Sequence, residues 1–143
     1  MRIICSILML IARICISAMF LLSGVHKFMD YSGTAEYMAT KHIPAMPYLF
    51  GAAFVEIIGG LSILLGYKIR FGSLLLILFL IPVTYFFHDF WNIQDPKAMQ
   101  AQMTHFFSNL ALFGGLLYVF CGGAGGCSID KTYCHAQKPP ETP

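Results

Sequence analysis

Charged residues are scarce in this sequence of 143 residues: Asp, Glu, Lys and Arg make up 11% of it, while hydrophobic residues make up 57%. Soluble domains carry about 25% charged residues. So small a share cannot cover a surface that faces water, and the composition therefore predicts an integral membrane protein. The net charge of +2 is small and scattered, with no run of Lys and Arg, which argues against a nucleic-acid partner.

A disulfide framework and thiol-exchange motifs are also missing. The number of cysteines is odd, two of them lie inside the first apolar stretch, and no C-x-x-C occurs. Near the C-terminus, Cys127 and the adjacent Cys134 and His135 allow a metal-binding interpretation, but their spacing matches no compact zinc pattern. Free thiols in a reducing cytoplasm are the interpretation that we favour. The cysteines are Cys5, Cys15, Cys121, Cys127 and Cys134.

Several catalytic signatures are absent as well. The sequence has no c-type haem motif, no flavin or nucleotide signature, and no Ser–His–carboxylate motif typical of hydrolases. The glycine-rich stretch 122–126 follows an apolar segment instead of preceding one, so it predicts a helix stop and not a phosphate-binding loop. Any electron transfer is therefore expected to involve a partner protein.

Four apolar segments are long enough to cross a lipid bilayer, which takes about 20 helical residues for each crossing. The first segment is too long for a signal peptide and is predicted to be an uncleaved membrane helix. The predicted fold is all-α: an antiparallel bundle of four transmembrane helices within residues 1–127, with both termini on the same side. The polar residues 128–143 are predicted to form a partly disordered tail. The predicted helices are 3–25, 48–67, 71–90 and 103–120.

Lys and Arg residues are distributed unequally between the two ends of this bundle. By the positive-inside rule, the richer end is predicted to be cytoplasmic, and it contains both termini. That end has Arg2, Lys68, Arg70, Lys131 and Lys138, whereas the other has Lys27, Lys41 and Lys97.

Two opposite charges, Arg13 and Glu56, lie near the centres of the first two segments. A central charge costs about 2.5–3.5 kcal/mol on insertion scales, so each charge needs a partner, water or a ligand. Arg13 shares a helix face with Ser17 and Gly24, which predicts that this face points inward. Antiparallel packing predicts that Arg13 and Glu56 meet at one depth and pair. The pair either only fixes the helix register, or makes Glu56 a proton carrier whose charge Arg13 sets.

Three histidines are predicted to lie at the same end of the bundle: His26 ends the first helix, His88 ends the third and His105 begins the fourth. Asn109 lies one turn deeper than His105, and Lys27 follows His26. Histidine is a metal ligand and a proton relay, and it can donate to a quinone carbonyl. These five residues are therefore candidate ligand-binding residues, and the three histidines are also candidates for a metal site. Alternatively, the histidines only end helices where water begins.

Several short motifs occur in a fixed order: GVHKF at 24–28, FMDYSG at 28–33, EIIGG at 56–60, Gly66, Arg70, HDFW at 88–91, NLALFGG at 109–115 and SID at 128–130. In this order and spacing, residues 11–130 resemble the DoxX family of small four-helix membrane proteins. The resemblance implies a location in a bacterial inner membrane and, as in some relatives, a place in a quinone-reducing sulfur oxidoreductase or an oxidative-stress complex. It also implies that Arg13, Glu56, His88 and Asn109 occupy the family's recurrent polar positions. The chain lacks the paired cysteines of four-helix quinone-linked thiol oxidoreductases, which argues against disulfide-forming catalysis.

Residues and resemblance together leave three hypotheses for the function. The preferred one is a redox-associated membrane subunit that binds a quinone or similar small ligand in its polar interior and passes electrons or protons to a partner redox protein. The second is a structural or assembly subunit of a membrane complex, without catalysis. The third is a small transporter, for which four helices leave little room unless the chain forms a homo-oligomer. Whether the chain is an enzyme stays open.

Overall fold

The computed structural model describes residues 2–130, with residues 2 and 45–47 described by their backbone only. Within this range the chain forms helices and no strand, and four helices are long and apolar enough to cross a membrane. The predicted all-α fold with four transmembrane helices is confirmed. The helices are α1 (Arg2–Met29), α2 (Tyr31–Thr40), α3 (Ala45–Leu65), α4 (Ile69–Phe87), the 3-10 helix η1 (Phe90–Asn92) and α5 (Pro96–Gly122).

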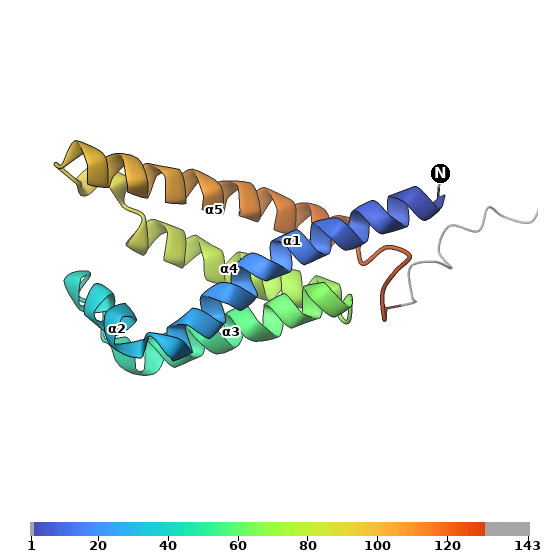
Figure 1. Cartoon of the computed structure of the whole chain (residues 1–143), viewed down its shortest axis with the longest axis horizontal. Helices are drawn as coiled ribbons and strands as arrows, with labels where there is room; N and C mark the ends of the chain where they lie inside the picture. The colour runs from blue at the N-terminus through green and yellow to red at the C-terminus, as the bar shows by residue number, and fades with distance from the viewer. Residues whose placement is uncertain (1, 131–143) are drawn as a thin grey trace, which may run out of the picture.

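The four long helices alternate in direction and pack in the order α1, α3, α4, α5 (Figure 1). α1 lies mainly along α3, whereas α1 and α5 touch only over a short stretch. A tight turn joins α3 to α4, and in it Gly66 and Lys68 have positive φ values of 64° and 47°. α3 and α4 are close at this turn and separate toward the end where α2 lies. The two ends are termed here the turn half, around Gly66, and the α2 half, around Met38.

Small residues let the helices approach closely in the turn half. A Cβ atom at Gly59 would lie 2.5 Å from Leu76 Cγ on α4, and one at Gly60 would lie 2.9 Å from Leu21 Cγ on α1. Such distances are too short for any side chain, so these helix pairs depend on glycine. The buried apolar core, which includes Leu76 and Leu116, also lies toward this half.

Two elements differ from those that the sequence predicted. α5 begins at Pro96 and not at residue 103, because Asp95 caps it by accepting a hydrogen bond from Ala98 N at 2.8 Å. α2 lies between the first two predicted helices, where no element was predicted, and Asp30 caps it in the same way through Gly33 N at 3.1 Å. Ten residues are too few to give a membrane-helix signal, so hydropathy missed α2.

The chain after α5 returns to the turn half and pairs with it. Ile129 N donates to Leu65 O at 3.2 Å, and Asp130 N donates to Gly66 O at 2.9 Å. Residues 128–130, which were assigned to the polar tail, are therefore attached to the helical body. The remainder of the predicted tail, including Cys134 and His135, lies outside the described residues.

Candidate functional site

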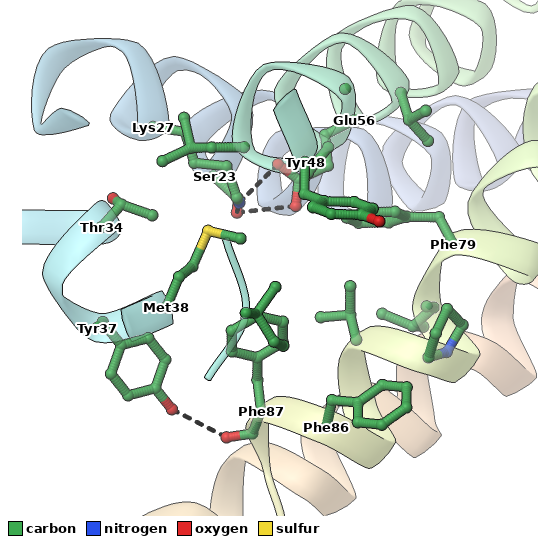
Figure 2. Close-up of a pocket in the computed structure, with 18 of the residues that line it drawn as sticks. Ser23, Lys27, Thr34, Tyr37, Met38, Tyr48, Glu56, Phe79, Phe86 and Phe87 are labelled. Carbon is green, nitrogen blue, oxygen red and sulfur yellow. Dashed lines mark hydrogen bonds and ion pairs between the residues drawn. The ribbon is translucent and has the colours of Figure 1, made fainter. Parts of the chain in front are cut away.

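A cavity of about 1020 Å³ lies in the α2 half, where α3 and α4 separate, and α1, α2 and α5 complete its walls (Figure 2). Its lining is largely apolar and includes Phe20, Met38, Leu49 and Phe79. Ligand pockets usually measure about 300–1,000 Å³, so this cavity can hold a molecule of drug-like size. A few polar side chains interrupt the apolar wall, and in such pockets these groups orient the ligand.

Lys27, Ser23 and Glu56 form one connected polar group in this wall, termed the Lys27–Glu56 cluster. Lys27 Nζ donates to Glu56 Oε2 and to Ser23 Oγ, each at 2.7 Å, and Ser23 Oγ donates to Glu56 Oε1 at 3.0 Å. Side chains of a helix lean toward its N-terminus, so Lys27 reaches back to Ser23, one turn earlier on α1. Glu56 is only 4% exposed, and the cluster balances one positive charge with one negative charge.

Arg13 does not belong to this cluster, so the predicted Arg13–Glu56 pair is wrong. Arg13 lies in the turn half, where Nη1 donates to Ala124 O at 2.7 Å and Nη2 donates to Leu64 O at 2.9 Å. It is 3% exposed, and Ser17 and Gly24 on the same face of α1 are buried too. The predicted inward face is thus confirmed, but the partners of Arg13 are backbone carbonyls and not a carboxylate.

The register of α1 against α3 explains the wrong pairing. Gly24 of α1 packs beside Glu56, whereas Arg13 packs beside Gly66 at the far end of α3. Glu56 and Gly66 are about 15 Å apart along a helix axis, at 1.5 Å per residue. α1 is longer than α3 and extends beyond it at the N-terminal end, so the centres of the two helices do not face each other.

The predicted histidine end forms a second polar part of the site. His88 Nδ1 donates to Gln102 Oε1 at 2.8 Å, and the His88 ring stacks on His105 with 5.4 Å between centroids. Asn109 Nδ2 donates to Thr84 Oγ1 at 3.1 Å. With Nδ1 as donor, Nε2 is the acceptor nitrogen of the neutral His88 ring. Sequence reasoning missed Gln102 because a lone Gln carries no motif.

Most of the predicted ligand-binding residues do line the cavity. His26, Lys27, His88 and Asn109 contribute to its wall, whereas His105 does not and reaches it only through its contact with His88. Across residues 2–130, no group of three or more His, Cys, Asp or Glu side chains could hold a metal ion. The three histidines therefore do not form the metal site that was considered.

α2 closes one side of the cavity and is attached to the end of α4. Tyr37 Oη donates to Phe87 O at 2.9 Å, and Lys41 forms an ion pair with Asp89. Met38, which lines the cavity, is buried. These contacts join segments that are about 50 residues apart in the sequence, so only the folded structure could show them.

The DoxX family model matches residues 8–89, which is more than half of the chain. The chain belongs to the DoxX family. It is 31% identical to the inner membrane protein YphA of Escherichia coli (strain K12) over 127 residues, which cover 87% of this chain and 89% of YphA. It is also 31% identical to the inner membrane protein YqjF of the same strain, over 85% of this chain and 88% of YqjF. No solved structure matches the chain.

The predicted DoxX resemblance is thus confirmed, and a second model, for the SURF4 family, matches residues 50–134. The Surfeit locus protein 4 homolog of Drosophila melanogaster is 31% identical over 80 residues, which are 53% of this chain and 30% of that relative. The DoxX match includes Lys27, Glu56 and His88, while Asn109 lies within the SURF4 match alone. This DoxX-family protein is therefore an integral membrane protein with a cavity that lies largely within the matched residues.

Proposed function

We propose that this DoxX-family protein is a redox-associated membrane subunit that binds a quinone in the cavity of the α2 half. The observation that carries the proposal is the Lys27–Glu56 cluster in an otherwise apolar wall. Because Glu56 already balances Lys27, an anionic head group would add an uncompensated charge in an apolar cavity. A neutral carbonyl needs only a hydrogen-bond donor, and Lys27 has one N–H left after serving Ser23 and Glu56.

In this proposal Lys27 and Glu56 also carry protons. Reduction of a quinone to a quinol adds one proton to each carbonyl oxygen, and the electrons come from a partner redox protein. Lys27 donates one proton to the nearer carbonyl and is reprotonated by Glu56, which takes up a proton from water. The proton for the second carbonyl oxygen also comes from water. Asn109 lies in the part of the wall formed by α4 and α5, where its second amide N–H can donate to the second carbonyl. His88 lies in the same part of the wall, and its Nε2 can accept a hydrogen bond from a quinol hydroxyl.

The proposal includes a location and an orientation. The names of YphA and YqjF support an inner membrane, and the excess of Lys and Arg that the sequence predicts at the end with both termini supports cytoplasmic termini. The cavity and α2 then lie toward the outer face. A purely structural role has less support, because it depended on Arg13 and Glu56 locking two helices together, and these residues have separate partners.

The test measures quinone binding to the purified protein in lipid nanodiscs. Quenching of the fluorescence of its single tryptophan, Trp91, reports the binding. The double variant Lys27→Met with Glu56→Gln removes both charges together and leaves no buried charge without a partner. Loss of a charge-assisted hydrogen bond, worth about 1.5–3 kcal/mol, predicts that the affinity for quinone falls about tenfold or more. Lys97→Met is the matched control, because Lys97 is exposed and lies outside the cavity.

Two results would contradict the proposal. If the wild-type protein shows no saturable quinone binding, the cavity has another ligand or none. If the double variant binds quinone as tightly as the Lys97→Met control, the Lys27–Glu56 cluster does not contact the head group.

A further inference from the structure

The cavity opens to the surface of the protein between α3 and α4. Tyr48 on α3 and Phe86 on α4 both line it, yet they are 60% and 55% exposed. Side chains that contact a cavity and are also exposed lie at an opening, and Tyr48 and Phe86 bring this condition to both α3 and α4. Met19 on α1 and Tyr37 on α2, which are 54% and 40% exposed, meet the same condition. Gly51, one turn after Tyr48, lines the cavity as well, and a Cβ atom there would meet nothing within 4 Å. In the turn half, by contrast, Gly59 brings α3 and α4 into contact.

This opening faces the bilayer. Tyr48, Gly51 and Phe86 belong to two of the helices that are long and apolar enough to cross a membrane, so in a bilayer the surface around them lies against lipid. At the end of the cavity, α2 is attached to α4 through Tyr37 and Lys41, which restricts entry from the aqueous side. A molecule dissolved in the membrane therefore has the less obstructed route.

We infer that the ligand enters from the bilayer between α3 and α4, and that its hydrocarbon tail occupies the opening framed by Tyr48, Gly51 and Phe86. The inference rests on the proposed function and narrows its ligand to quinones with a long apolar tail. The head group then lies at the Lys27–Glu56 cluster, deeper in the cavity. The volume of about 1020 Å³ is at the upper end for ligand pockets, which suits a ligand larger than a quinone ring alone.

The test fills the opening and compares two probes. Gly51→Trp places a large side chain where the structure has free space, so the helix is expected to remain intact. The matched control is Gly114→Trp on α5, where a Cβ atom also meets nothing within 4 Å but which does not line the cavity. The probes are a benzoquinone with a long isoprenoid tail and the same head group without a tail, each titrated in nanodiscs.

We expect Gly51→Trp to weaken binding of the tailed quinone about tenfold, as loss of about two buried methylene groups would. Binding of the tail-less quinone should change less than about twofold, and Gly114→Trp should leave both unchanged. An equal loss for both probes, or no loss for the tailed one, would overturn the route between α3 and α4. If the wild-type protein binds neither probe, the proposed function itself fails.

A second measurement locates the tail directly. A tailed quinone with a photoreactive group at the end of its tail should label peptides of α3 and α4 that surround Gly51 and Phe86. Labelling confined to α1 and α5 would place the tail on the other side of the cavity and would overturn the inference.

Discussion

The turn half and the α2 half each contain a basic residue of α1, Arg13 and Lys27, but the hydrogen-bond partners of the two residues differ in kind. In the turn half, Arg13 donates to two backbone carbonyls, at Ala124 and Leu64. In the α2 half, Lys27 meets a carboxylate and a hydroxyl. Arginine stays protonated in proteins and presents a fixed fork of donors, which suits a permanent structural contact. A lysine paired with a glutamate can exchange protons, which suits a site of chemistry.

The two halves also differ in how closely their helices pack. Gly59, in the turn half, leaves no room for a Cβ atom beside Leu76, whereas Gly51, in the α2 half, has open space around it. The apolar core lies toward the turn half and the cavity lies in the α2 half. The turn half is therefore the more closely packed of the two, and the α2 half contains the cavity.

The largest expected effect of a single change is at Arg13. Arg13→Met leaves the carbonyls of Ala124 and Leu64 without their donors, and hydrogen bonds to a charged group contribute about 1.5–3 kcal/mol each. We expect the free energy of unfolding to fall by about 3 kcal/mol or more. Thermal unfolding in detergent measures this, with Lys97→Met as the control. A loss below about 1 kcal/mol would show that Arg13 is not a structural contact.

The same variant separates stability from binding. At temperatures where Arg13→Met is still folded, its affinity for quinone should equal that of the wild-type protein, because Arg13 does not line the cavity. A selective loss of binding at such temperatures would contradict the division of the molecule into two halves.

Hydropathy predicted the four membrane helices because each long apolar stretch must satisfy its own backbone hydrogen bonds in lipid. The helical period also predicted that Arg13, Ser17 and Gly24 face inward, since side chains three and four residues apart share a face. The relative depth of two helices has no such local signal. It depends on where Gly24 of α1 and Gly60 of α3 pack against the facing helix, and this packing gave Glu56 the partner Lys27 in place of Arg13.

α2 is a second example of a feature that the sequence predicts only in part. Its cap residue Asp30 is of a type that favours helix starts, so the sequence does contain a local signal for α2. Its position against α4, however, depends on Tyr37 meeting a backbone carbonyl that lies 50 residues further along the chain. Such a contact follows from the tertiary fold and not from any local pattern.

Two glycine substitutions test the difference in packing between the halves, and their expected effects on the free energy of unfolding are smaller than that of Arg13→Met. Gly59→Ala forces a Cβ atom against Leu76, and overpacking of this kind costs about 1–3 kcal/mol. Gly51→Ala should instead be neutral or stabilising by up to about 1 kcal/mol, because alanine favours a helix and the space is free. Chemical unfolding of both variants in the same detergent measures the difference. Equal effects would mean that the two halves are packed alike.

The smallest effect is expected where α2 is attached to α4. Tyr37→Phe removes the hydrogen bond to Phe87 O and keeps the ring, so the loss is about 0.5–1 kcal/mol, and the contact is exposed. Global stability should barely change, whereas the amide hydrogens of α2 should exchange about two to five times faster. Tyr118→Phe, at an exposed position on α5, is the matched control. If hydrogen exchange in α2 is as slow in Tyr37→Phe as in the Tyr118→Phe control, the Tyr37 hydrogen bond does not hold α2 in place. Other contacts then close the cavity on this side.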